Sequence, residues 1–189
     1  GLSRKADGTG TIDVVNMATR RATNLPSLGV YENKLHVNTV LAASPNGATI
    51  LAASADGSVM LYNASADTFT ISRKDFEELS GAFAASNYQM YVVDNHLLNA
   101  SLVPVGRMES ATGASSGFVF VDQGGFRSTT PGDAAPGVIQ RMDLSSAAGI
   151  RPTRMAEAPL SPTICSSSKV RGFTRTLAAL ASRTAVVSL

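Results

Sequence analysis

The chain has 189 residues and a formal net charge of +2, and 44% of its residues are hydrophobic, 16% are charged and none is Trp. This composition supports a buried core and excludes a wholly disordered chain, because disordered sequences combine few apolar residues with many charges. The single cysteine, Cys165, excludes an intrachain disulfide and a zinc site made of several cysteines.

The basic residues are unevenly distributed along the chain. From Ser145 onward there are six Arg or Lys residues and a single acid, Glu157. Nucleic-acid binding favours a denser basic stripe with aromatic side chains between the charges, so we expect a solvated face and no nucleic-acid partner. No apolar run reaches the roughly 18 residues of a membrane-spanning helix. The sequence begins without a secretory signal, and its first residues resemble the middle of a repeat. We therefore expect the chain to be a segment of a longer protein.

The first expected strand covers Thr11 to Met17, after a Gly-rich turn at Ala6 to Gly10. Asp7 and Asp13 in this setting invite a calcium interpretation, but the spacing of a calcium-binding loop is missing. The two nearby glycines precede a strand instead of a helix, which also excludes a dinucleotide fingerprint. The segment therefore predicts a turn and a strand.

A hairpin-rich segment follows. Its turns are Ser44-Pro45-Asn46-Gly47 and Ser54-Ala55-Asp56-Gly57, and Asn-Gly and Asp-Gly between β-forming residues are strong hairpin signals because they tolerate positive φ. The helical character of Asp75 to Leu79 predicts one helical turn. The four strands expected in this segment form one antiparallel sheet and cover Thr39–Ala43, Ala48–Ala53, Ser58–Asn63 and Thr68–Ser72.

The same pattern then returns. Ala84-Ala85-Ser86 repeats Ala42-Ala43-Ser44, and Leu177-Ala178-Ala179 repeats Leu41-Ala42-Ala43. The alternative for Leu177 to Val187 is an amphipathic helix, because Ala and Leu favour helices. Further strands are expected at Asn99–Val105, Gly117–Asp122, Gly137–Leu144 and within Phe173–Leu189.

Strands that recur with a period of roughly 40 to 50 residues are typical of β-propeller blades. Stacking four-stranded sheets about an axis covers both faces of each sheet and leaves only short edges. We therefore predict an all-β fold of antiparallel four-stranded blades, with blades beginning near residues 1, 40, 82 and 125 and a fifth near 170. The whole chain, 1–189, is expected to be one partial or open propeller.

Three motifs resemble the β-propeller superfamily, in its bacterial YVTN-like and NHL-like branches. Ser44-Pro45-Asn46-Gly47 followed by Ile50-Leu51 is similar to the turn of YVTN-type blades. Met90 to His96 is similar to an NHL repeat, and Val138 to Asp143 to a blade-closing strand. The resemblance implies a fold more than an activity. The paired motifs of WD repeats and the tryptophan motif of quinoprotein propellers are missing from the sequence, and no cofactor is predicted.

The region 105–136 is rich in Gly, Ser, Thr and Pro and predicts a long loop. Recognition residues are common on such loops, because a rigid scaffold holds them at the surface. Its most contact-capable side chains, and so the candidate binding residues, are Arg107, Gln123, Phe126 and Arg127.

Few residues suggest catalysis or metal binding. His36, Asp94 and Asp122 are candidate metal ligands if successive blades present them to a central channel, but His36 and His96 are not in equivalent positions. No Gly-x-Ser-x-Gly elbow occurs. Adjacent carboxylates at Glu77-Glu78 point apart on a helical turn and form a poor acid–base pair.

Three hypotheses follow. The leading one is a non-enzymatic scaffold or recognition module of a bacterial secreted or surface protein, whose partner is a protein or a small ligand. The alternative is a lactonase-like or other hydrolytic propeller enzyme with a divalent metal in its channel. In the third, further sequence or another copy of the chain supplies the missing blades and closes the ring.

Overall fold

The computed structural model describes residues 1–108, 114–130, 136–144 and 151–157, and every regular element in these residues is a β-strand. In chain order the strands are β1 (Leu2–Arg4), β2 (Thr9–Asn16), β3 (Arg21–Asn24), β4 (Ser27–Leu28), β5 (Tyr31–Glu32), β6 (Leu35–His36), β7 (Thr39–Ala43), β8 (Thr49–Ser54), β9 (Val59–Asn63), β10 (Thr68–Arg73), β11 (Phe83–Ala85), β12 (Tyr91–Val93), β13 (His96–Leu98), β14 (Pro104–Arg107), β15 (Ser115–Val121), β16 (Gly124–Thr129), β17 (Val138–Asp143) and β18 (Arg151–Glu157). No helix within these ranges is long and apolar enough to cross a membrane.

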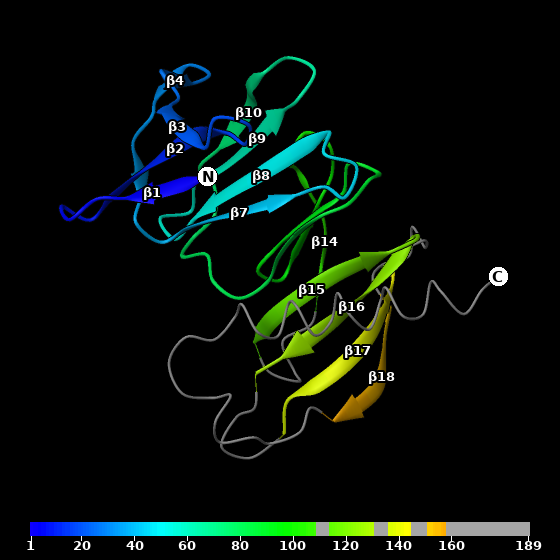
Figure 1. Cartoon of the computed structure of the whole chain (residues 1–189). Coiled ribbons are helices and arrows are strands. Elements are labelled where there is room, and N and C mark those ends of the chain that lie inside the picture. The colour runs from blue at the N-terminus through cyan, green and yellow to red at the C-terminus, as the bar shows by residue number, and fades with distance from the viewer. Residues whose placement is uncertain (109–113, 131–135, 145–150, 158–189) are drawn as a thin grey trace. The chain divides into compact units, whose positions relative to one another are not determined.

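Within the described residues the strands form four antiparallel sheets of four strands each, and β4 and β5 pair as a separate two-stranded sheet (Figure 1). In the second, third and fourth sheets, strands that follow one another in sequence are neighbours in space, in the orders β7 to β10, β11 to β14 and β15 to β18. In the first sheet the order is β1-β2-β3, and β6 also pairs with β2. This sheet-after-sheet arrangement of short meanders is that of propeller blades.

The chain divides into two compact units. The first consists of Gly1–Ser80, Ala85–Tyr91 and Asn99–Val103, and the second of Gly81–Ala84, Val92–Leu98 and Pro104–Leu189. The first two sheets belong to the first unit and the fourth sheet belongs to the second. The third sheet contributes residues to both units.

The second sheet confirms the meander predicted from the sequence. Strand β7 has the predicted limits, and the limits of the next three strands differ from the prediction by one residue at most. Gly47 and Gly57 take positive φ values of 69° and 87° in the two tight turns. Leu51 on β8 and Val59 on β9 are fully buried, so the two central strands anchor the sheet.

The first sheet repeats the last three strands of the second. Asp7 and Asp56 each accept a hydrogen bond from the backbone N–H two residues later, at 3.0 and 3.1 Å. Asn16 and Asn63 each accept hydrogen bonds from the N–H groups two and three residues later, at 2.9 to 3.2 Å. Because both turns recur in the same order, β1, β2 and β3 correspond to β8, β9 and β10.

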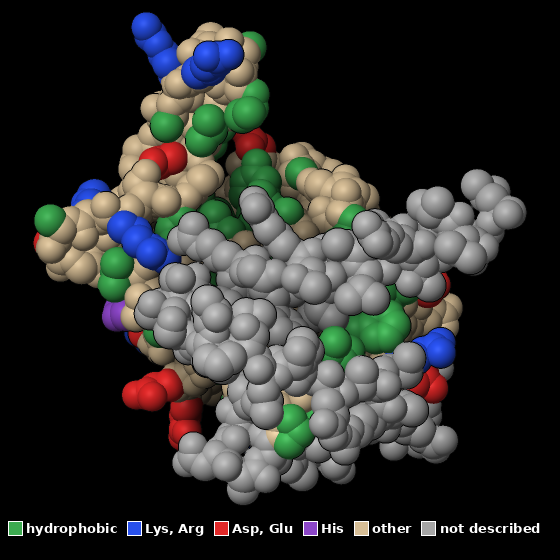
Figure 2. Space-filling view, turned by 60° about the horizontal axis from the view of Figure 1, so that its bottom comes forward, with side chains coloured by type: hydrophobic (Ala, Val, Ile, Leu, Met, Phe, Trp, Pro, Cys, Tyr) green, Lys and Arg blue, Asp and Glu red, His purple; other side chains and the backbone are tan. Residues whose placement is uncertain are grey.

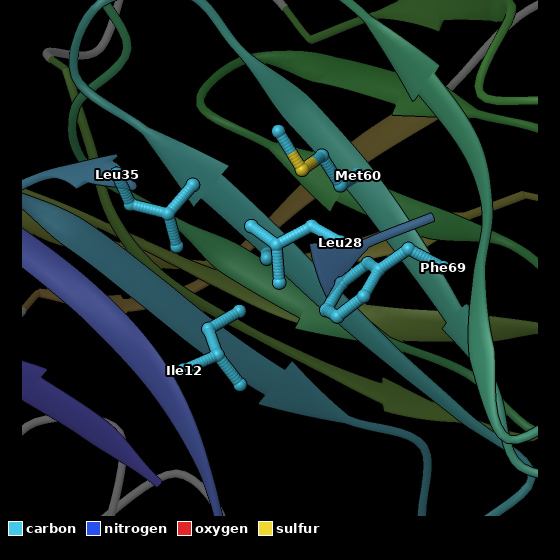
Figure 3. Close-up of a cluster of buried hydrophobic side chains, with 6 residues drawn as sticks. Ile12, Leu28, Leu35, Met60 and Phe69 are labelled. Carbon is cyan, nitrogen blue, oxygen red and sulfur yellow. The ribbon is translucent and has the colours of Figure 1, made fainter. Parts of the chain in front are cut away.

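The apolar core of the first unit lies where residues of the first two sheets and the intervening segment meet. Ile12, Leu28, Leu35, Met60 and Phe69 are all buried and point toward one another (Figure 3). The ring of Phe69 also packs edge-to-face on Tyr62, with centroids 5.5 Å apart. Burying side chains of this size stabilises the fold by about 1.5–3 kcal/mol each.

Two local predictions are wrong. Asp75 to Leu79 contains no helical turn, and its first carboxylate instead pairs with Arg73 at the end of β10. The strand expected at Asn99–Val105 is a turn that leads into β14, because the Asn99 side chain accepts hydrogen bonds from the N–H groups of Ser101 and Val103, both at 3.0 Å. Asn competes with strand hydrogen bonding in this way wherever its side chain reaches its own backbone.

The region 105–136 contains the strand expected at Gly117–Asp122, observed as β15, and also β16, where loop was expected. Strand β15 begins the fourth sheet at Ser115 instead of near residue 125, and β16 follows inside the same region. Gly124 and Gly125, at the start of β16, allow neighbouring strands to pack closely. A Cβ on Gly124 would lie 2.6 Å from the Met142 carbonyl oxygen, and a Cβ on Gly125 would lie 2.5 Å from the Val119 carbonyl oxygen. Residues 109–113 and 131–135, the strand expected within Phe173–Leu189, its helical alternative and the fifth blade lie outside the described residues.

Gly57→Ala is expected to lower the free energy of unfolding by about 3 kcal/mol or more, since the new Cβ would lie 1.9 Å from the Phe76 carbonyl oxygen at a φ of +87°. Gly8 is the matched control, because it occupies the equivalent turn at a φ of +82° with nothing within 4 Å. Gly8→Ala should cost only about 1 kcal/mol. Chemical denaturation measures both, and equal losses would contradict this interpretation of the second turn.

Candidate functional site

A groove with polar and apolar lining in the first unit is the candidate site. It runs between the segment that carries β5 and β6 and the second sheet, and its volume is about 380 Å³. The residues that line it are Tyr31, Glu32, Lys34, Leu35, His36, Ser54, Asp56, Ser58, Met60, Ser72 and Lys74. We call it the β6 groove.

The second sheet shapes one wall of the β6 groove. Alternate residues of an extended segment share a face. Met60 on β9 and Ser72 on β10 therefore project to the same side as Ser58, just before β9, and Lys74, just after β10. Met60 lies directly opposite Ser72 in the strand register. The groove therefore combines a thioether with hydroxyl groups on a face that the sheet holds rigid.

Buried residues form the floor of the groove. Leu35 and Met60 belong to the apolar core of the first unit. Ser54 is also buried, and its hydroxyl shares a 2.7 Å hydrogen bond with that of Thr39. An apolar floor with a few convergent polar groups is the usual composition of a ligand site.

Charges of both signs surround the groove. Asp56 lies 3.5 Å from the Lys74 ammonium group. Burial alone would raise the pKa of the Asp56 carboxyl, but hydrogen bonds from Ser58 and the nearby charge of Lys74 outweigh burial and lower it below its ordinary value. The other charged residues that line the groove are Lys34 and Glu32, so its positive and negative charges are equal in number. Such a groove suits a ligand with polar and apolar parts.

Of the predicted metal ligands, His36 is the one that lines the groove. Its ring is exposed, and Nδ1 accepts a hydrogen bond from the backbone N–H of Asn38 at 3.2 Å. Asp94 and Asp122 stand in hairpin turns at positive φ values of 54° and 49°, a backbone conformation that Asp tolerates. Among the described residues, no three His, Cys, Asp or Glu side chains form a group that could hold a metal ion.

Arg127, a predicted binding residue, is instead an internal residue of the fourth sheet with 1% exposure. Its guanidinium donates hydrogen bonds to Ser115 Oγ at 2.6 Å, to Asn95 Oδ1 at 2.9 Å and to Gln140 Oε1 at 3.3 Å. Burial lowers the pKa of Arg127, and the nearby carboxylate of Asp94 opposes that effect. This buried network links three strands of the fourth sheet, β15, β16 and β17, to the β12–β13 turn within the second unit.

The other three predicted binding residues are at or near the surface. Arg107 and Gln123 are exposed, and Phe126 is half-buried. Phe126 and Arg127 are consecutive on β16, so their side chains point to opposite faces of the sheet. The four residues therefore do not form one contact surface.

Sequence reasoning missed the β6 groove because its lining comes from three separate stretches, near residues 31–36, 54–60 and 72–74. The signal that was present is the alternation of Ser58 with Met60 and of Ser72 with Lys74. On the face shown in Figure 2, the described Lys and Arg side chains lie in separate places and form no continuous stripe. The lack of a nucleic-acid partner stays a prediction.

Comparison with solved structures identifies the fold. The chain is similar to dihydro-heme d1 dehydrogenase NirN in complex with DHE (TM-score 0.57, 18% identity, 85% of this chain and 36% of that chain). It is also similar to the Cps50 (Swd1) β-propeller domain of Myceliophteria thermophila (TM-score 0.53, 14% identity, 83% and 54%) and to the RRP9 WD40 repeats (TM-score 0.52, 10% identity, 73% and 43%). No protein-family model and no curated protein sequence matches the chain.

These likenesses show a β-propeller fold. The chain is all-β in the described residues, its sheets are antiparallel meanders of four strands, and the structures that it resembles are propellers and WD40 repeats. It spans only 36% to 54% of their length. At identities of 18% and below, the likeness concerns the fold and not the activity.

Arg127→Ala is expected to lower the free energy of unfolding by at least about 3 kcal/mol, because it leaves the buried oxygens of Asn95 and Gln140 without these donors and opens a cavity. Arg107→Ala, at the exposed predicted site, should stay within about 0.5 kcal/mol of wild type. Denaturant titration compares the two. Similar stabilities would show that the network contributes little.

Asp56 should titrate below its ordinary pKa in the folded chain. Lys74→Ala and Ser58→Ala should each raise that pKa, whereas Lys34→Ala should not. Because the folded-state pKa is the lower one, ionised Asp56 stabilises the fold above the unfolded-state pKa, and this contribution is lost as pH falls through the folded-state pKa. Carboxyl ¹³C NMR titration tests this, and an unchanged midpoint in both variants would contradict it.

Proposed function

We propose that the chain is a recognition module of a β-propeller protein and that the β6 groove is its ligand site. The observation that carries this proposal is the groove itself, in which hydroxyl, ammonium and carboxylate groups surround an apolar floor on a rigid sheet. The volume of about 380 Å³ suits a small ligand or a few residues of a peptide. The partner is a protein segment or a small polar molecule.

The chemistry of the groove supports a binding role for Asp56. Its lowered pKa keeps this carboxyl ionised near neutral pH, so it offers a fixed negative charge to a ligand. The Asp56 carboxylate also accepts the Ser58 backbone N–H at 3.1 Å and lies beside Lys74. These contacts fix the Asp56 carboxylate at the rim of the groove and keep its negative charge beside the Lys74 ammonium group.

The subtype and setting of this module belong to the same proposal. The Ser44-Pro45-Asn46-Gly47 turn supports YVTN-like blades, since the Ser44 hydroxyl accepts the Thr49 N–H at 3.0 Å and donates to Asn46 Oδ1 at 2.8 Å. Such blades fit a bacterial secreted or surface protein. The proposal includes further sequence or another copy of the chain that completes the ring, and its support is that the chain spans only 36% to 54% of the length of the structures that it resembles.

Substituting Ser72→Trp should fill the β6 groove and weaken ligand binding at least tenfold, since Ser72 lines the groove opposite Met60. Ser65→Trp is the control, because Ser65 is exposed on a hairpin turn of the same sheet and does not line the groove. Peptide and glycan arrays find the ligand, and titration calorimetry measures the affinities. A ligand that binds both variants as tightly as wild type would rule out this site.

A further inference from the structure

The outer end of the first sheet is an exposed arm. All residues from Val14 to Asn24, the ends of β2 and β3 and their turn, are exposed. Met17 is 82% exposed and Val14 is 52% exposed, and Arg20 and Arg21 follow in the same arm. Exposed apolar side chains beside cations are more typical of an interaction surface than of a solvated hairpin.

The second sheet contains the same turn without these side chains. Asn16 and Asn63 fix the two turns with equivalent hydrogen bonds, and each turn passes through positive φ four residues later, at Arg20 (55°) and Asp67 (50°). Ala64, Asp67 and Thr68 of the second turn occupy the places of Met17, Arg20 and Arg21. The turn therefore does not require a methionine or two arginines, and these residues are available for another role.

The first unit also carries an acidic segment that could receive the arm of another molecule. Glu77 and Glu78 are adjacent and exposed after β10. The charges just before them are already paired, Arg73 with Asp75 and Lys74 with Asp56. Within the described residues, neither glutamate has an ion pair, and neither do Arg20 and Arg21.

We infer that the arm binds the Glu77-Glu78 segment of a second copy of this chain. Two adjacent cations match two adjacent anions in number, and none of the four takes part in an ion pair within the described residues. A symmetric pair of molecules would form the contact twice, with Arg20 and Arg21 facing the partner's glutamates and Met17 losing its exposure to water. This surface is distinct from the β6 groove.

The test uses complementary charge variants of the full chain. By sedimentation equilibrium the wild type should associate, and added salt should weaken the association. Arg20→Glu with Arg21→Glu, and separately Glu77→Arg with Glu78→Arg, should each raise the dissociation constant at least about tenfold, because like charges then face each other. Arg4→Glu with Lys5→Glu makes the same change in net charge outside the arm and should leave the association unchanged.

Mixing the two charge variants is the decisive measurement. Each arm then meets a segment of opposite charge, so the mixture should associate as wild type does although each variant alone does not. Misfolding cannot produce this rescue. A wild type that stays monomeric, or a mixture that fails to associate, would overturn the inference. Arm-dependent binding to phosphatidylserine-containing vesicles by a monomeric chain would overturn it in favour of a lipid partner.

Discussion

The fold depends on single side-chain oxygens that accept the backbone N–H groups of their own turns. Asp7, Asn16, Asp56, Asn63 and Asn99 all act in this way, at 2.9 to 3.2 Å. Ser86 does the same with its hydroxyl at the turn before β12. Because a turn determines which residues of two strands face each other, these bonds also determine which side chains are buried.

This constraint explains why the sequence predicts the blades well. The Asn46-Gly47 and Asp56-Gly57 turns are local signals, and they fix the limits of the second sheet almost to the residue. The same side-chain-to-backbone hydrogen bonding explains the error at Asn99–Val105. The Asn99 side chain bonds to its own turn there, so residues whose apolar pattern predicts a strand form a turn. At Gly124 and Gly125 the error is the opposite one, because the sequence predicts a loop where a strand forms. Glycine is common in loops, but here it allows two strands to pack closely.

The candidate site was much harder to predict. The β6 groove is assembled from residues more than 40 positions apart, and no local pattern reports which faces will meet. Arg127 shows the other limit. A charged residue in a polar stretch is normally exposed, but here Ser115, Asn95 and Gln140 supply enough acceptors to bury it. Only tertiary structure distinguishes that environment from a binding surface.

The equivalent turns at Asn16 and Asn63 have a consequence for how such repeats acquire new roles. Each asparagine fixes its loop through the backbone N–H groups of the tip residues, so the identity of the side chains at the tip is left free. Side-chain substitutions at Ala64 to Ala66 would therefore leave the strand register intact, because they keep these backbone N–H groups in place. Duplicated blades can accumulate changes at such tips independently, and one copy can preserve stability while its sibling diversifies.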